Sequence, residues 1–369
     1  MVEWKKLGDI CNILDSLRKP VSKGDRKKGD YPYYGANGIQ DYVDSYIFDG
    51  TYLLLGEDGS VINTDKSPVI HWAIGKIWVN NHAHVLEENE AAYLRYVYYS
   101  LQCTDVSDLV QGVPPKINQA NMRGILIPVP SKTEQTRIVG ILDTFTSSIE
   151  NLKEQIAQRR KQYEYYRDQL LDLEGKEEKD IHFWGEFCEM IKGNGVQKVD
   201  FVDEGVGCIH YGQIYTHYGP YTYETNKFVS KEVFEKARKA SKGDIIMTDT
   251  SENVEDICKS VAYLGDDDIA VSNHALIIKH QQNPKFLSFS TQTNSFLVQK
   301  RKYVVGAKVS GIKPDHLAQI KIYLPSLSEQ QRIVSILDTF EASIQNLEAQ
   351  LKQREKQYEY YRNKLLTFE

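Results

Sequence analysis

A long segment occurs twice in this chain, and the repeat restricts the folds that the chain can adopt. Residues 131–171, SKTEQTRIVGILDTFTSSIENLKEQIAQRRKQYEYYRDQLL, align without a gap on residues 326–366, SLSEQQRIVSILDTFEASIQNLEAQLKQREKQYEYYRNKLL. About two thirds of the aligned positions are identical, and the stretch KQYEYYR is unchanged. The repeat indicates a duplicated unit in which a globular domain is followed by a helix.

Each copy of the repeat begins with a helix-start signal. Ser131 follows a proline and precedes Glu134 by three positions, and Ser326 with Glu329 repeats this arrangement. In a capping box, the serine hydroxyl accepts the N–H of the third helical residue, while the glutamate side chain accepts the N–H of the serine. We therefore predict two helices that start at equivalent points.

Apolar residues in both copies follow one another at alternating steps of four and three. This spacing is typical of a coiled coil and is narrower than the apolar stripe of an ordinary surface helix. The residues that we expect to form this helix-pair seam are Ile138, Leu142, Phe145, Ile149, Leu152, Ile156, Tyr163, Tyr166, Leu170, Ile333, Leu337, Phe340, Ile344, Leu347, Leu351, Tyr358, Tyr361 and Leu365.

Two such seams in one chain can bury each other. A parallel and an antiparallel pair would both satisfy the hydrophobicity, but an antiparallel pair around a pseudo-twofold axis also closes the duplicated unit on itself. We therefore expect antiparallel helices. In the remaining alternative each helix packs only on its own globular half, which would call for a wider apolar stripe.

The segments outside the repeat read as two mixed α/β domains, so the fold class expected is α+β. Short apolar runs between Gly and Asn turns predict strands at residues 52–55, 76–79, 244–247 and 274–278, and helices are expected near 91–102 and 284–293. The predicted organisation is a first domain at 1–130, a central helix at 131–175, a second domain at 176–325 and a terminal helix at 326–369.

The two predicted domains differ in sequence but keep some landmarks in the same order. Residues 79–86, VNNHAHVL, match residues 271–278, VSNHALII. We also aligned Tyr33-Tyr34-Gly35 with His210-Tyr211-Gly212, and the strand after Gly50 with the strand after Gly243. Nearly identical helices with divergent domains suit a scaffold that offers one surface twice and recognises two different targets.

Composition excludes several classes of protein. No apolar run approaches the roughly 18 residues of a membrane span, and the opening residues MVEWKK form no signal peptide, so we expect a cytoplasmic protein without a membrane. The 5 cysteines are scattered without a C-x-x-C pair, which argues against disulfides and a zinc site. The net charge of -6 counts weakly against nucleic-acid binding, because only the docking face must be basic.

The chain closely resembles the specificity subunit of type I restriction-modification systems. The resemblance covers the central repeat with EQTRIVGILD, the terminal repeat with EQQRIVSILD, and the stretches YPYYGANGIQDYV, WVNNHAHVL, PPKINQANM and IHYGQIY. It implies two target-recognition domains that each read one half of a bipartite site in double-stranded DNA. It also implies that the helices act as a spacer and dock two methyltransferase (modification) subunits, which restriction subunits join.

The resemblance further implies a subunit without catalysis or cofactor of its own, and a search for motifs agrees. No Asn/Asp-Pro-Pro-Tyr/Phe motif of amino-methyl transfer and no G-x-x-x-x-G-K-S/T phosphate loop occurs. A self-contained methyltransferase or nuclease is therefore disfavoured. A coiled-coil adaptor that binds no DNA, and the specificity subunit of a related methyltransferase or nuclease system, remain as alternatives.

In the first domain, polar residues in predicted loops are candidates for DNA contact. Asn37 and Gln40 follow Tyr34 in a loop, although Asn37-Gly38 can also be a plain hairpin turn. A basic run that could hold phosphates, or could be merely a solvated surface, includes Lys23, Arg26 and Lys27.

Two further loops complete the candidate set. Lys116 and Asn118 lie in a proline-stiffened loop, and Lys308 with Ser310 is the counterpart in the second domain. His82 and His274 recur at equivalent places without neighbouring ligands, so we expect a structural role and no metal or catalytic site. The other candidates in the second domain are Tyr211, Gln213, Asp249, Thr250 and Ser251.

Overall fold

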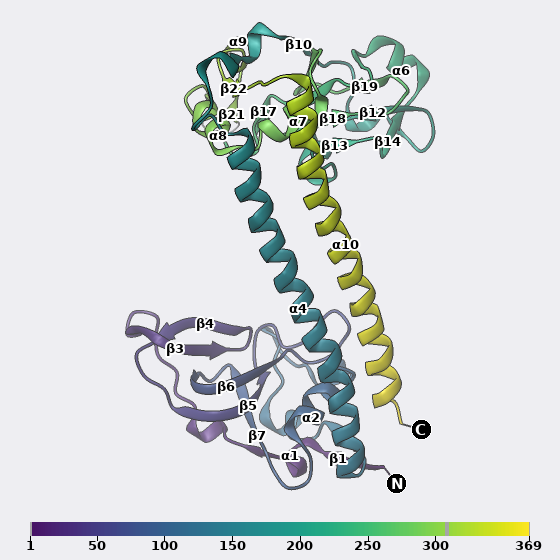
Figure 1. The fold of residues 1–369 in the computed structure, drawn as a ribbon. Coiled ribbons are helices and arrows are strands. Elements are labelled where there is room, and N and C mark those ends of the chain that lie inside the picture. Colours follow the sequence, from purple (N-terminus) through teal and green to yellow (C-terminus); the bar gives the residue numbers. More distant parts are fainter. Residues whose placement is uncertain (1, 307–309, 369) are drawn as a thin grey trace. The chain divides into compact units, whose positions relative to one another are not determined.

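The computed structural model describes residues 2–306 and 310–368, and it divides into two compact units. Unit 1 comprises the chain up to residue 154 and from residue 348 onward, and unit 2 comprises residues 155–347. The helices α4 (Lys132–Leu171) and α10 (Leu327–Leu366) each contribute to both units. Each unit therefore combines one mixed α/β domain with a part of both long helices (Figure 1), which confirms the predicted fold class.

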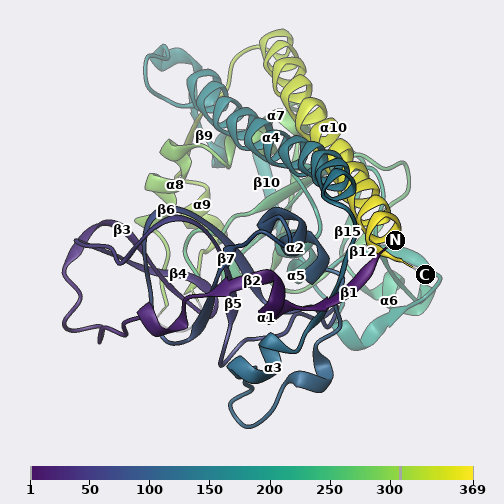
Figure 2. The same cartoon turned by 90° about the horizontal axis from the view of Figure 1, so that it is seen from below.

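Unit 1 is built on a six-stranded sheet with the strand order β2-β7-β5-β6-β3-β4. Its neighbours are antiparallel except for the pair β3 and β6. A separate ribbon pairs β1 with β8, and α1 and α2 lie close together in both ribbon views (Figures 1 and 2). The elements are β1 (Glu3–Lys6), α1 (Leu7–Ile10), β2 (Cys11–Ile13), β3 (Lys28–Gly35), β4 (Gly38–Val43), β5 (Phe48–Gly56), β6 (Ile70–Val79), β7 (Ala83–Glu88), α2 (Leu94–Leu101), α3 (Gln119–Arg123) and β8 (Leu126–Val129).

The central strand β5 contains the apolar run Tyr52 to Leu55, and its burial on both faces explains why this run predicted a strand. Leu53 and Leu55 enter the core that also holds α2 and the long helices, whereas Tyr52 and Leu54 enter a second core on the opposite face. A strand covered on both faces needs a continuous apolar run, because successive side chains point to opposite sides.

Unit 2 contains two five-stranded sheets, β10-β20-β16-β18-β13 and β11-β14-β12-β19-β15, and two short ribbons, β17-β21 and β22-β9. Its helices α7 and α8 pack on the first sheet and on both long helices. The strands are β9 (Ile181–Phe183), β10 (Cys188–Lys192), β11 (Phe201–Val202), β12 (Val206–Ile209), β13 (Tyr221–Thr222), β14 (Lys227–Val229), β15 (Lys239–Ala240), β16 (Ile245–Thr248), β17 (Thr250–Ser251), β18 (Ser260–Tyr263), β19 (Ile269–Val271), β20 (Ala275–His280), β21 (Ser310–Gly311) and β22 (Lys321–Tyr323). The helices are α5 (Tyr211–Thr216), α6 (Lys231–Lys236), α7 (Pro284–Ser290), α8 (Asn294–Arg301) and α9 (Pro314–Leu317).

The two long helices run antiparallel, as contacts within unit 1 show. Phe145 of α4 stacks on Tyr361 of α10, with ring centroids 5.3 Å apart, and Lys153 pairs with Glu355 at 3.6 Å. A step forward along α4 is therefore a step backward along α10. Among the residues described, no helix is both long and apolar enough to cross a membrane.

Unit 2 makes the equivalent contact with the roles of the helices exchanged. Tyr166 of α4 stacks on Phe340 of α10 at 5.4 Å, and the ring planes meet at 29°, against 25° in unit 1. An arginine completes both clusters, at 5.8 Å from the Phe340 ring and 5.6 Å from the Phe145 ring. The duplicated sequence thus builds one surface twice.

The helix starts form only half of the predicted capping box. The hydroxyls of Ser131 and Ser326 accept the N–H groups of Glu134 and Glu329 at 3.3 and 3.4 Å. Each glutamate side chain binds the arginine three positions further on, at 2.6–2.8 Å, and not the serine N–H. A charge-assisted bidentate pair with arginine is the stronger alternative for an exposed carboxylate.

Two of the three landmark alignments between the domains were wrong in register. The N–H of Asn80 binds the carbonyl of Tyr34, whereas that of Ser272 binds Ile209, so Tyr34 corresponds to Ile209 and not to Tyr211. The N–H groups of Glu57 and Asp249 likewise bind equivalent histidine carbonyls, which shifts the alignment at Gly50 by one residue. Short matching runs of sequence do not determine which residues of the two domains are equivalent. The hydrogen bonds to the neighbouring strand determine it.

Candidate nucleic-acid interface

Four loops of unit 1 come together at one edge of its sheet. The carbonyl of His82 accepts the N–H of Glu57 at 2.8 Å, and the carbonyl of Pro115 accepts that of Gly59 at 2.9 Å. The N–H of Asn80 binds the carbonyl of Tyr34 at 3.1 Å, near the end of β3 that leads into the turn at 36–37. These bonds join the turn at 36–37, the segment 57–60, the turn at 80–82 and the loop 111–118 into one surface, which we call the loop edge of unit 1.

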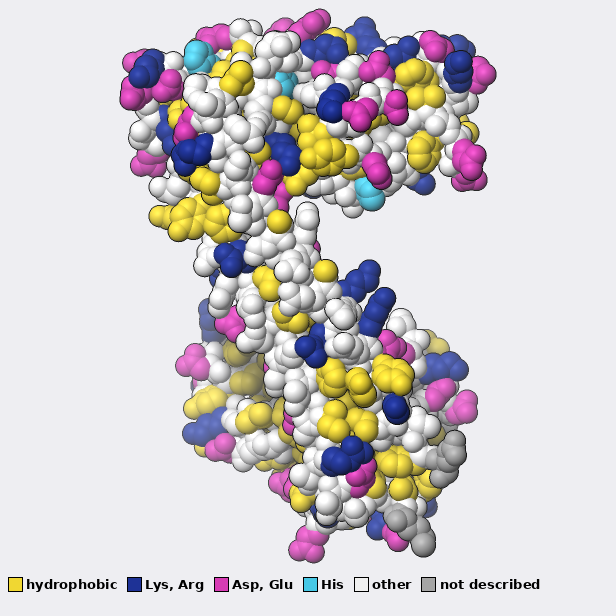
Figure 3. Space-filling model, turned by 45° about the vertical axis from the view of Figure 1, so that its right-hand side comes forward, with side chains coloured by type: hydrophobic (Ala, Val, Ile, Leu, Met, Phe, Trp, Pro, Cys, Tyr) yellow, Lys and Arg dark blue, Asp and Glu magenta, His cyan; other side chains and the backbone are white. Residues whose placement is uncertain are grey.

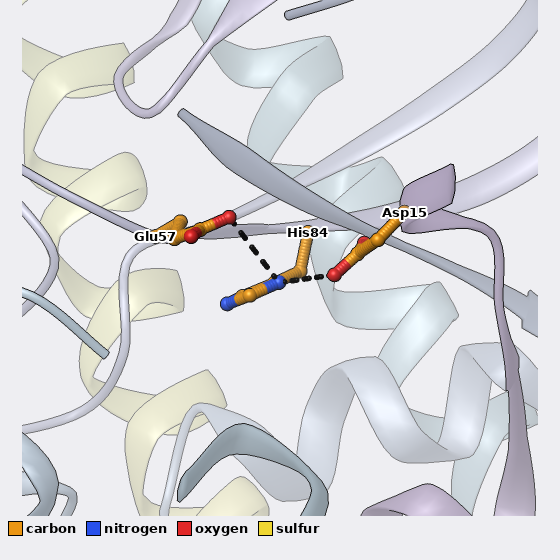
Figure 4. Close-up of side chains that lie close together, drawn as sticks. All are labelled: Asp15, Glu57 and His84. Atoms are coloured by element: carbon orange, nitrogen blue, oxygen red, sulfur yellow. Dashed lines mark hydrogen bonds and ion pairs between the residues drawn. The ribbon is translucent and has the colours of Figure 1, made fainter. Parts of the chain in front are cut away.

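A buried charge network supports this loop edge. His84 is fully buried, and its Nδ1 lies 2.6 Å from Asp15 and 3.7 Å from Glu57 (Figure 4). Its Nε2 lies 2.9 Å from the carbonyl of Ile117. Arg18 binds Glu57 at 2.6 Å, and Lys116 binds the same carboxylate at 3.0 Å. The network therefore ties β5, β7 and the loop 111–118 to the start of the domain.

The network also sets the ionisation of its carboxylates. Burial opposes the charged form of Asp15, but hydrogen bonds from His84 and Gln119 outweigh burial and lower the pKa of this carboxyl group. Burial acts in the same way on Glu57, and the bonds from Arg18 and Lys116 lower its pKa below the ordinary value. Both carboxylates are therefore held as anions that position cations.

Asp15, Glu57 and His84 bring three possible metal-ligand atoms within 4.8 Å of one another. A metal ion there would have to displace existing bonds, because both ring nitrogens of His84 already face acceptors. A histidine that binds a metal needs a free lone pair on one ring nitrogen, and these contacts occupy both nitrogens. The cluster fits a structural network and fits a metal poorly.

The predicted contact residues of unit 1 fall into two groups. Lys23, Lys27, Asn37 and Gln40 are exposed, and Tyr34 is half-buried on β3. The remaining three are engaged within the unit: Arg26 stacks on Tyr33 and pairs with Asp41, Lys116 pairs with Glu57, and Asn118 caps α3 by accepting the N–H of Asn121.

Unit 2 builds a corresponding edge with different side chains. Asp249 occupies the position of Glu57, and its backbone N–H binds the carbonyl of His274 at 3.2 Å. Its carboxylate is buried and pairs with Lys192 at 3.0 Å. The ring of Tyr211 lies 4.3 Å from that of His210 and 5.3 Å from that of His274. At the equivalent backbone positions, unit 2 thus carries the Lys192–Asp249 ion pair and a cluster of aromatic rings.

Several predicted residues of unit 2 are occupied or buried. Gln213 is 9% exposed, and its amide binds the His210 backbone and the Asn226 side chain, so it holds the start of α5. Thr250 and Ser251 are half-buried in β17, which pairs with β21 at Ser310. Burial, with Lys198 and His274 nearby, lowers the pKa of His210, consistent with its Nδ1 accepting the N–H of Gly212. Lys308 lies outside the described residues.

Sequence reasoning missed two exposed residues at the edge of unit 1. The backbone of Lys19 binds Val79 and the Trp78 ring, which places this lysine beside the turn at 80–82. Val113 is fully exposed in the loop 111–118. Neither carried a motif, although the neighbouring prolines marked the second. On the face shown in Figure 3, positive and negative side chains are interspersed.

A family model described as "Type I restriction modification DNA specificity domain" matches residues 1–159 and 177–355. A putative type I restriction enzyme specificity subunit of Haemophilus influenzae is 32% identical, with 100% of this chain and 96% of that protein covered. The EcoR124I/EcoR124II specificity subunit of Escherichia coli is 27% identical over 100% of this chain and 94% of its own length.

A solved structure shares the fold at lower sequence identity. The S subunit of a type I restriction-modification system from M. genitalium superposes with a TM-score of 0.62 at 15% identity, and covers 100% of this chain and 97% of that structure. The similarity therefore extends over both domains and both long helices.

Proposed function

We propose, from the premise that this chain belongs to the type I restriction modification DNA specificity family, that its two domains each read one half of a bipartite site in double-stranded DNA. The repeated helices would set the spacing of the half-sites and dock two methyltransferase subunits, and restriction subunits would join that core. The observation that carries the proposal is the contrast between a helix surface built twice and two loop edges that differ.

The loop edges supply the groups that base reading requires. Asn and Gln side chains can pair with adenine, and lysines can hold phosphates. Asn37, Gln40 and Lys19 are exposed at the edge of unit 1, whereas the edge of unit 2 carries the ring cluster of Tyr211 and the Lys192–Asp249 ion pair. Since the two sets differ, the two half-sites should differ in sequence.

The helix surface supplies two matching places for one kind of partner. Tyr165 and Tyr360 are 61% and 59% exposed, although each forms an edge-to-face pair with the next tyrosine. Exposed tyrosines are enriched at protein interfaces. The repetition in both units favours two copies of the same subunit over two different partners.

The chain is proposed to carry no catalysis of its own. Within the residues described, the grouping of carboxylates and histidine that could hold a metal is the buried network at His84, whose ring nitrogens are already bonded. Methyl transfer to adenine and cleavage of DNA would therefore be performed by the partner subunits.

A reconstitution with its methyltransferase subunit tests the proposal. The chain alone should transfer no methyl group from S-adenosylmethionine, whereas the assembled complex should methylate adenines at one bipartite site. Methyl transfer by the chain alone, or an assembled complex without site preference, would contradict the proposal.

The salt dependence of binding separates DNA contact from a purely structural adaptor. Changing Lys23 and Lys27 to alanine should weaken binding of the complex to all duplexes alike and should lower the slope of log K against log salt by up to about 2. The matched control is Lys6→Ala, an exposed lysine on β1. An unchanged slope in the double variant would favour the adaptor.

A further inference from the structure

The most exposed large hydrophobic side chain in the described part of the protein belongs to Val113, at 101% relative exposure. It lies in the segment Gly112-Val113-Pro114-Pro115, which we call the apolar tip. Single exposed hydrophobic residues are common on protein surfaces and need no explanation by themselves. The apolar tip differs because the structure holds it rigidly at the loop edge of unit 1.

Hydrogen bonds fix the base of the tip on both sides. Gln111 and Lys116 exchange two backbone bonds of 2.8 Å, and Gly59 donates to the carbonyl of Pro115 at 2.9 Å. The next residue, Ile117, is fully buried and binds the backbone of Glu57 at 2.9 Å. The carbonyl of Ile117 is also the acceptor for buried His84. The charge network at His84 thus anchors this loop.

The composition of the tip decides what it can offer to a partner. Pro114 and Pro115 have no N–H groups, and the carbonyl of Pro115 is already used by Gly59. Gly112 has a φ of 80°, a conformation that favours glycine. The most exposed side chain of the tip is that of Val113, which offers two methyl groups, with Asp58 and Lys116 beside it along a shallow pocket.

We propose that Val113 reads the 5-methyl group of a thymine in the half-site of unit 1; this rests on the proposed function. On the edges of base pairs in the major groove, the thymine methyl group is the apolar feature, while the other groups are hydrogen-bond donors and acceptors. A rigid apolar tip among polar loops is complementary to that group. Its rigidity also means that little side-chain entropy is lost on contact, because valine has one rotatable bond.

The test uses the complex of the full chain with its methyltransferase subunit and DNA in which single thymines of the half-site are replaced by deoxyuridine. Deoxyuridine differs only by the missing methyl group. In the wild-type complex one such replacement should weaken binding about fourfold, the effect of one buried methyl group. In the Val113→Ser complex the same replacement should have no effect. The matched control is Ile74→Ser on β6, which is 68% exposed and should respond to deoxyuridine like wild type.

The outcomes separate this inference from the proposed function. The inference would be overturned if the wild-type and Val113→Ser complexes were equally sensitive to deoxyuridine, or if no thymine replacement weakened binding. In either case the proposed function would stand as long as binding remained site-selective. A Val113→Ser chain that no longer binds the methyltransferase subunit would assign the tip to a protein contact instead. A wild-type complex without site-selective binding would overturn both.

Discussion

The two junctions between domain and helix pair are built alike on the helix side and differently on the domain side. Gln135 and Gln330 occupy equivalent positions, and each binds the proline carbonyl before its helix and one backbone N–H of the neighbouring domain, at 2.8–3.0 Å. Asp143 pairs with Arg95 in unit 1, whereas the equivalent Asp338 pairs with Lys285 in unit 2.

This difference shows which parts of a duplicated unit were able to diverge. The glutamine and the aspartate lie on the repeated helices and are unchanged, while their partners on the domains differ in type. Among the helix positions that do differ, Thr146 of unit 1 corresponds to Glu341 of unit 2. The junction thus keeps its geometry, and its chemistry can be altered in one unit at a time.

The largest effects should come from the leucines that both helices bury in their domains. Leu142 and Leu337 are equivalent and fully buried in the cores of unit 1 and unit 2. Each change to alanine should lower the free energy of unfolding by about 2–5 kcal/mol, measured by denaturant titration. Ser147→Ala, which installs the residue of the other copy at an exposed site, is the control. A large effect in one unit only would break the equivalence of the two cores.

The second prediction concerns the acidic residue that only unit 2 carries at its junction. Burial, with Asp338 nearby, raises the pKa of Glu341 to about 7, against an ordinary value of 4.5, and Lys285, Tyr163 and Tyr221 oppose this in part. Between pH 4.5 and about 7, the folded state therefore keeps a proton on Glu341 that the unfolded state has released. The stabilisation is complete below pH 4.5 and is lost as the pH rises through about 7.

Changing Glu341 to threonine, the residue of unit 1, should remove this dependence. Relative to wild type, the variant should gain stability as the pH rises from 4.5 to 7, by no more than about 3 kcal/mol. Unfolding titrations at several pH values measure the difference. Thr146→Glu is the reciprocal variant and should give unit 1 the same dependence. If the free energies of unfolding of wild type and Glu341→Thr changed with pH in parallel, Glu341 would titrate at its ordinary pKa, which would contradict the prediction.

A smaller effect is expected from exchanging the cations at the two junctions. Arg95 binds Asp143 and also lies 4.9–5.0 Å from the rings of Trp72, Tyr98 and Tyr99, a combination that a lysine cannot reproduce. Arg95→Lys should therefore cost about 1 kcal/mol of stability, by thermal or denaturant unfolding. Lys285→Arg should cost less stability. Lys285 pairs with Asp338 and lies over the single ring of Tyr221, contacts that either cation can make. The reverse order would contradict this reading of the junctions.

The sequence predicted the helix pair well because a heptad pattern depends on spacing alone, and equivalent residues such as Phe145 and Phe340 carry it in the two copies. It could not predict the network at His84, because Asp15 and Ile117 reach this residue from distant parts of the chain. Polarity singled out Gln213, but it could not show that the amide of this residue caps α5. All the proposed DNA-contact residues remain predictions, and of these Asn37, Gln40, Lys23 and Lys27 are exposed.

The measurement that tests the central claim most directly is a map of methylated adenines from cells that express this chain with its methyltransferase. The map should be compared with that of a chain in which residues 1–130 are replaced by the corresponding domain of a relative. Independent reading by two domains on one scaffold predicts that one half of the bipartite sequence changes while the other half is kept. A change in both halves, or in neither, would contradict the account.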